Sequence, residues 1–203
     1  MRGKIVPNVK KVALRKVIDQ ILASMSQEDR QRQSKVIVDK ILSHPKYKEA
    51  KRIALFLSLP SEVNTEPILR DILSRGDAAF VPQYCKGKMR MLRVLPGDLE
   101  AMPETSWGIK QHAKDVVRED ALDNGGLDLV IAPGAAFTAA GWRLGHGGGY
   151  YDRYLAELKR RHAEEPGAFV DPYILAVGFK QQLFEEVPVD GQDVKVDEVV
   201  TAE

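Results

Sequence analysis

The sequence predicts an α/β protein with an open, mainly parallel sheet flanked by helices in a Rossmann-like three-layer arrangement. Apolar runs of strand length alternate with amphipathic segments of helical period, which is typical of parallel sheets. The strongest runs, 52–59, 126–134 and 173–179, are almost continuously apolar, as strands covered on both faces are. The 203 residues contain no repeat or linker, so we expect one domain spanning 1–203.

The expected elements follow from local signals taken in chain order. Asn8 and Ser26 are each placed to cap a helix, and the second of these helices should end before Pro45. Pro67 lies in the first turn of a third helix, which Gly76 ends. Helices are therefore expected over 9–22, 27–44, 65–75 and 150–162, and strands over 52–59, 78–84, 89–95, 126–134, 173–179 and 198–201.

Composition narrows the possible partners and compartments. A net charge of +1 gives no basis for binding nucleic acid, and no apolar run approaches the roughly 20 residues of a membrane helix. The single Cys85 excludes an intramolecular disulfide, which suits a reducing compartment. We therefore expect a cytoplasmic monomer without membrane or nucleic-acid partners. The first eighteen residues are basic and lack acids, so a mitochondrial targeting segment stays open as an alternative.

The segment 141–155, GWRLGHGGGYYDRYL, concentrates residues suited to phosphate chemistry. Four of its glycines fall within 145–149, between Arg143 and Asp152. Glycine lets backbone N–H groups turn toward a ligand, and the start of a helix adds the positive end of its dipole. Asp152 is placed where a carboxylate can hold a cation that accompanies phosphate. A flexible surface loop is the simpler alternative for such a glycine cluster.

The glycine-rich segment matches neither of two common nucleotide motifs. It lacks the GxxxxGK[ST] pattern of the Walker loop. The third glycine of a GxGxxG pattern would fall at Tyr150, so a nicotinamide cofactor is not indicated. A Ser-His-Asp triad has no supporting GxSxG either.

Topology predicts which loops should meet. In open parallel sheets, ligands bind outside the carboxyl ends of the strands. The loops after 52–59, 126–134 and 173–179 should therefore share one cleft. This places Glu62 and the glycine-rich segment together with the loop that carries Asp190, Asp193 and Asp197.

These residues together carry a resemblance to a known family. Pro133, Gly134, Phe137 and the run 141–152 closely resemble the signature of 5-formyltetrahydrofolate cyclo-ligases, also called methenyltetrahydrofolate synthetases. The similarity covers nearly the whole chain, and its further matches are residues 11–15, 56–58, Glu62, Trp107 with the two residues after it, 187–189, Asp193 and 196–198. One departure is His146, at a position where arginine is common. The charge of a histidine near neutral pH depends on its surroundings, whereas a guanidinium is always charged. The departure therefore affects how firmly this position would bind phosphate, and not the resemblance to the family.

The resemblance implies an ATP- and Mg²⁺-dependent conversion of 5-formyltetrahydrofolate, with or without a polyglutamate tail, to 5,10-methenyltetrahydrofolate, ADP and phosphate. A formyl oxygen is a poor leaving group, so phosphorylating it would activate the formyl carbon toward the neighbouring folate nitrogen. Such chemistry asks a protein mainly for positioning and charge stabilisation.

The same resemblance implies a role for each matching residue. Asp152 and Asp193 would hold magnesium, directly or through water, and His146 and Tyr151 would be catalytic. Folate would contact Leu57, Glu62, His146, Gly147, Gly148, Gly149 and Tyr150. ATP would contact Lys11, Arg15, Arg143, Leu144, Gly145, His146, Gly147, Gly148, Gly149, Tyr150 and Tyr151.

Plainer roles remain open for several of these residues. Lys11 and Arg15, spaced i, i+4, could form a solvated basic face, and Glu62 could cap the helix that starts near Thr65. A sugar-phosphate isomerase or coenzyme A transferase on a similar sheet would need a paired acid and base, which the sequence does not offer. A non-catalytic folate- or nucleotide-binding module would keep Glu62 and the glycine-rich segment without releasing phosphate.

Overall fold

A computed structural model describes residues 8–85, 87–106 and 108–203 of the chain. Trp107 and the first seven residues of the basic amino-terminal segment lie outside this range, and with them the Trp107 match and part of the segment on which the targeting alternative depends. None of the described helices combines the length and the apolar character needed to cross a membrane.

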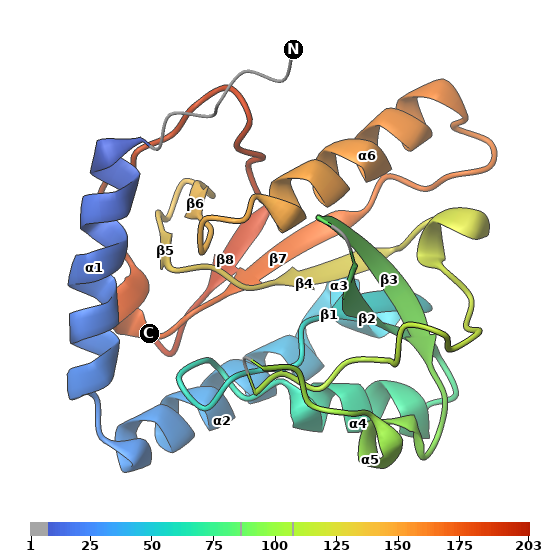
Figure 1. Cartoon of the computed structure of the whole chain (residues 1–203), viewed down its shortest axis with the longest axis horizontal. Helices are drawn as coiled ribbons and strands as arrows, with labels where there is room; N and C mark the ends of the chain where they lie inside the picture. Colours follow the sequence, from blue (N-terminus) through green and yellow to red (C-terminus); the bar gives the residue numbers. More distant parts are fainter. Residues whose placement is uncertain (1–7, 86, 107) are drawn as a thin grey trace.

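The centre of the molecule is a six-stranded sheet with the strand order β3-β2-β1-β4-β7-β8 (Figure 1). All neighbours pair in parallel except β3, which is antiparallel to β2. This confirms the predicted α/β class and its open, mainly parallel sheet. The strands are β1 (Arg52–Leu55), β2 (Ala78–Cys85), β3 (Lys88–Val94), β4 (Leu129–Ala132), β7 (Tyr173–Val177) and β8 (Glu198–Val200).

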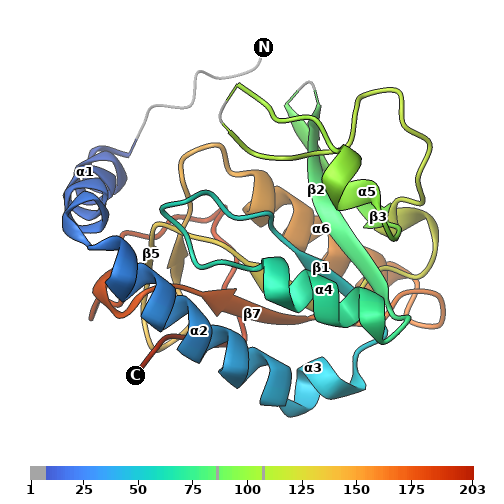
Figure 2. The same ribbon diagram turned by 90° about the horizontal axis from the view of Figure 1, so that it is seen from below.

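Helices cover both faces of the sheet. α2 (Gln27–Ser43), α3 (Pro45–Glu49) and α4 (Glu66–Ser74) lie on one face, and α6 (Tyr150–Glu164) lies on the other (Figures 1 and 2). The long helix α1 (Val9–Ser24) stands at the edge of the domain and contacts the short helix η2 (Lys180–Gln182). The smaller elements are α5 (Asp98–Ala101), η1 (Ala121–Asp123), β5 (Ala136–Phe137) and β6 (Arg143–Leu144).

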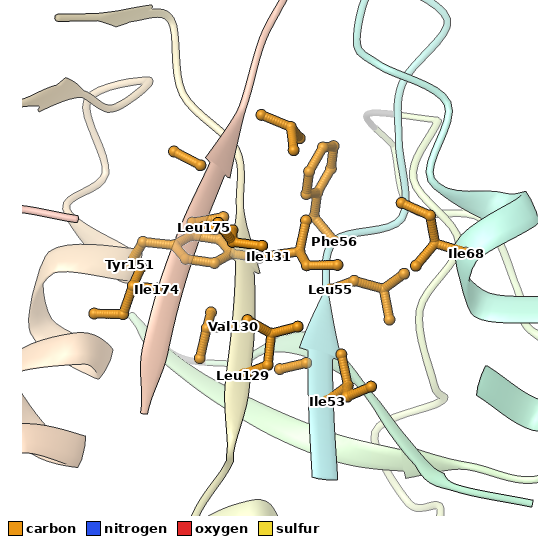
Figure 3. Close-up of a cluster of buried hydrophobic side chains, with 14 of the residues drawn as sticks. Ile53, Leu55, Phe56, Ile68, Leu129, Val130, Ile131, Tyr151, Ile174 and Leu175 are labelled. Carbon is orange, nitrogen blue, oxygen red and sulfur yellow. The ribbon is translucent and has the colours of Figure 1, made fainter. Parts of the chain in front are cut away.

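The core fills the space between these layers. Strand residues such as Ile53, Val130 and Ile174 are fully buried, and Ile68 packs from α4 onto the same cluster (Figure 3). These are the apolar runs that predicted two-sided strands. A sheet buried on both faces is rigid, so it can hold the loops at its carboxyl edge in fixed positions.

Several predicted boundaries differ from the structure: the strands expected over 126–134 and 173–179 are shorter, spanning Leu129–Ala132 and Tyr173–Val177. Two other differences have local reasons. Pro45 ends α2 as expected but also begins α3, because proline suits the first turn of a helix and the His44 side chain accepts a hydrogen bond from Lys46 N–H. The strand predicted over 52–59 ends at Leu55. Thr65 Oγ1 donates to the carbonyl oxygen of Phe56 (2.6 Å), and the chain turns away from the sheet while staying buried.

The strand order also creates a crevice. From β1 the chain moves to β2 on one side, whereas from β4 it moves to β7 on the other. The connections therefore diverge between β1 and β4, which is where open α/β sheets bind their ligands.

Candidate active site

A cavity of about 330 Å³ lies at the carboxyl ends of β1, β2 and β4. The loop after β1 supplies Leu57 and Glu62, and β2 supplies Tyr84. Most of the remaining wall comes from residues of the glycine-rich segment and the first turn of α6. The prediction that Glu62 and the glycine-rich segment share one cleft at this edge is therefore confirmed.

The glycine-rich segment presents unpaired backbone donors beside this cavity. Gly147 and Gly149 have φ values of 111° and 62°, which glycine adopts without the steric cost of a Cβ. Gly149 is also the N-cap residue of α6 and has no side chain to occupy the first N–H groups of the helix. Among the described residues, the N–H groups of residues 145–149 find no hydrogen-bond acceptor. Such a run of free donors at a helix start suits an anion.

A buried ion pair between Arg143 and Asp152 joins the two ends of the glycine-rich segment. Arg143, with 2% of its side chain exposed, donates from Nη2 to Asp152 Oδ1 (2.8 Å) and from Nη1 to the Pro133 carbonyl oxygen (3.2 Å). The backbone N–H of Val194 also donates to Asp152 Oδ1 (3.2 Å). Asp152 thus connects β6, α6 and the loop before β8.

Two basic residues of α1 reach the same region. Lys11 Nζ lies 2.8 Å from Asp190 Oδ2 and 2.5 Å from Asp193 Oδ2, and only 10% of its side chain is exposed. Burial lowers the pKa of Lys11, but its hydrogen bonds to the two aspartates outweigh this, so the pKa stands above its ordinary value. Arg15 Nε donates to the Gly145 carbonyl oxygen (2.7 Å). The alternative of a solvated basic face is therefore wrong for Lys11.

Glu62 faces the glycine-rich segment across the cavity. Its Oε2 accepts a hydrogen bond from Leu59 N–H (2.8 Å), and its Oε1 lies 3.5 Å from Nε2 of His146. The alternative that Glu62 caps α4 is wrong, because Asn64 Oδ1 accepts the hydrogen bond from Glu66 N–H at that helix start.

Tyr151 is the most deeply buried side chain of the expected catalytic pair. It is 6% exposed, and its hydroxyl has no hydrogen-bond partner among the described residues. Burial, with smaller contributions from Tyr84 and Glu62, raises its pKa well above the ordinary value, so the hydroxyl stays protonated near neutral pH and keeps a proton to donate. Tyr150 forms an aromatic wall instead, since its ring meets that of Tyr84 edge-on with centroids 5.0 Å apart.

The predicted grouping of three aspartates is wrong for Asp197. Its Oδ2 accepts a hydrogen bond from Ile174 N–H near the start of β7, at the opposite edge of the sheet from the cavity. Asp197 directly precedes β8, which runs parallel to β7, so it must lie at the amino ends of these strands. Leu144 has its side chain in the core, and only its backbone can serve a ligand.

Two residues near the site were not assigned a role from the sequence. Tyr84 lines the cavity, and Asp190 binds Lys11. Nothing in a tyrosine within an apolar strand or an aspartate in a loop distinguishes them, because their partners are distant in the chain.

Asp152 and Asp193 are the carboxylates expected to hold magnesium. The residue after Asp193 donates to Asp152, so the two acids come from adjoining backbone. Magnesium favours carboxylate oxygens and takes its other ligands from water and phosphate. No described group of three or more His, Cys, Asp or Glu residues could hold a metal ion alone. Two carboxylates are too few to hold the ion alone, so the expected magnesium would take its other ligands from phosphate and water, and it would have to displace Lys11 from Asp193.

Comparisons with known proteins agree on one family. The model of the 5-formyltetrahydrofolate cyclo-ligase family matches residues 7–202. A 5-formyltetrahydrofolate cyclo-ligase of Mus musculus is 42% identical over 196 residues, covering 95% of this chain and 94% of the relative. A probable 5-formyltetrahydrofolate cyclo-ligase of Caenorhabditis elegans is 33% identical, covering 94% and 91%. The solved structure of Aquifex aeolicus 5,10-methenyltetrahydrofolate synthetase is similar with a TM-score of 0.76 at 28% identity, covering 95% and 90% of the two chains.

Proposed function

The chain belongs to the 5-formyltetrahydrofolate cyclo-ligase family and is a ligase, and from this premise we propose that it cyclises 5-formyltetrahydrofolate to 5,10-methenyltetrahydrofolate at the expense of ATP, with magnesium. The observation that carries the proposal is that Glu62 faces the free N–H groups of the glycine-rich segment across one cavity. The anion site and the Glu62 carboxylate then border one space, in which the phosphates of ATP and the folate can meet. The monomeric state and the cytoplasmic location remain predictions from the sequence.

On the nucleotide side, the chain offers donors and positive charge. The N–H groups of residues 145–149 and the start of α6 would receive phosphate oxygens. Arg143 places a buried cation at the base of the cavity, and Arg15 places another beside Gly145. Asp152 and Asp193 would hold magnesium, which supplies positive charge to the phosphates when it is bound.

On the folate side, the cavity offers a carboxylate and apolar walls. Glu62 can accept paired hydrogen bonds from the amino-pyrimidine edge of a pterin, and its Oε2 is already oriented by Leu59 N–H. Leu57, Tyr84 and Tyr150 line the same space and can pack against flat rings.

The reaction follows from bringing these two sides together. The formyl oxygen attacks the terminal phosphorus of ATP, and the bond from that phosphorus to ADP breaks. The second folate nitrogen then attacks the formyl carbon and loses its proton, while the carbon–oxygen bond breaks and phosphate leaves. Tyr151, whose buried hydroxyl has no partner among the described residues, would donate its O–H to an oxygen at the reacting centre, and Arg143 in the same cavity would offset the charge that develops there.

The proposal is tested by incubating the protein with 5-formyltetrahydrofolate, ATP and Mg²⁺. We expect the long-wavelength ultraviolet absorbance of the methenyl product, with one ADP and one phosphate for each product molecule. Substrate labelled with heavy oxygen in the formyl group should pass that label to the released phosphate. A folded sample that yields no methenyl product rejects the activity, and label that stays out of the phosphate rejects the proposed phosphorylation step.

A further inference from the structure

The Lys11 ion pairs conflict with two roles that the family resemblance implies, phosphate binding by Lys11 and metal binding by Asp193. Lys11 Nζ lies 2.7 Å from Oδ1 and 2.5 Å from Oδ2 of Asp193, so one ammonium covers both carboxylate oxygens. Oδ2 also accepts a hydrogen bond from the backbone N–H of Asp190 (2.6 Å). In this arrangement Lys11 cannot bind a phosphate, and Asp193 cannot take a metal ion, unless the pair separates.

The charges around this pair allow such a separation when another cation arrives. Within the ion-paired cluster, Asp152, Asp190 and Asp193 carry three negative charges against the two positive charges of Lys11 and Arg143, which leaves one net negative charge; Arg15 lies nearby but donates to the Gly145 carbonyl oxygen and to none of these carboxylates. Arg143 is fixed to Asp152 within the core. Lys11 is therefore the cation of this cluster that can be exchanged, since a divalent ion beside Asp193 would compensate for its departure.

Lys11 also lies in a part of α1 that can move without breaking many apolar contacts. It is the one buried residue in the first half of α1 as far as the structure describes it, and Val9 beside it is 79% exposed. The apolar anchors of the helix, Ile18 and Leu22, come two and three turns later. Asp190 is half-exposed, so its side of the pair already faces water.

We propose that Lys11 is an exchangeable counterion, whose ammonium neutralises Asp190 and Asp193 until magnesium and nucleotide bind together, and then transfers to the phosphates. The inference rests on the proposed function for the identity of the ligands. It adds a role for Asp190 and makes metal and nucleotide binding cooperative, because metal alone must compete with Lys11 for Asp193.

The test measures metal binding without nucleotide, using Mn²⁺ as the probe and calorimetry as the readout. Lys11→Met should bind Mn²⁺ at least about tenfold more tightly than the unaltered chain, which is the effect of removing roughly 1.4 kcal/mol of competition. Lys16→Met removes an exposed lysine from the same helix and should leave Mn²⁺ affinity unchanged. Adding Asp193→Asn to Lys11→Met should abolish the gain.

A second readout follows folding rather than binding. The uncompensated aspartates should lower the melting temperature of Lys11→Met, and Mn²⁺ should restore it, whereas Mn²⁺ should hardly change the melting of Lys16→Met. If Lys11→Met folds poorly, Lys11→Gln offers the same comparison with a side chain that can still donate hydrogen bonds. Mn²⁺ affinity equal to that of the unaltered chain in both Lys11 variants would overturn the exchange. Turnover of the unaltered chain in the same conditions separates that outcome from failure of the proposed function.

Discussion

Tyr151→Phe should raise the stability of the protein while removing most of its activity. The Tyr151 hydroxyl is buried without a partner in the described structure, and burying an unpaired hydroxyl costs about 1–3 kcal/mol. Removing it should therefore raise the free energy of unfolding by about 1 kcal/mol, or the melting temperature by about 2–4 °C at this chain length. Loss of one preorganised donor to the reacting centre should lower kcat by about 100-fold.

Tyr154→Phe is the matched control. Its hydroxyl is also buried and unpartnered among the described residues, but it lies three residues further along α6 and outside the cavity lining. It should show the same gain in chemical denaturation and an unchanged kcat in the methenyl absorbance assay. If Tyr151→Phe keeps full activity, its hydroxyl does not serve the reaction. If it loses stability instead, the hydroxyl has a hydrogen-bond partner in the folded protein, which would contradict its burial without one.

Three further predictions test the surroundings of the cavity. Asp152→Asn should lower the free energy of unfolding by about 3 kcal/mol in denaturant titrations, because buried Arg143 loses its compensating charge; a change near zero would contradict the buried pair. Glu62→Gln should raise the KM for 5-formyltetrahydrofolate about tenfold or more while the KM for ATP stays within about twofold, and equal changes would remove Glu62 from the folate side. Burial raises the folded-state pKa of Tyr151 and Tyr154, so the stability that their neutral state contributes should be fully present below about pH 10, the ordinary tyrosine pKa, and should be lost as pH rises above it; Tyr151→Phe should reduce that slope, and an unchanged slope would contradict their buried, neutral state.

Most of the fold could be predicted because its signals are local. Apolar runs marked five strands of the parallel part, and caps such as Asn8 and Ser26 marked helix starts that the structure confirms. The strand expected over 52–59 was too long, because residues lining a buried cavity are as apolar as residues in a buried strand. The two-residue strands β5 and β6 are too short to carry a period at all.

The part of the site that could be predicted also has local signals in the sequence. The glycine-rich segment is contiguous, so its composition alone indicated an anion site. The contacts of Lys11 join residues 179 and 182 positions apart, and no local pattern reports them. Asp197 was misplaced because its loop runs from the cavity to the opposite edge of the sheet, a path that depends on the direction of β8.

A crystal structure with 5-formyltetrahydrofolate, Mg²⁺ and a non-hydrolysable ATP analogue tests the central claim most directly. We predict that the terminal phosphate lies against the N–H groups of residues 145–149, with its phosphorus facing the formyl oxygen and the pterin edge at Glu62. A nucleotide bound away from residues 143–152, or a folate whose formyl group points away from it, would contradict the account.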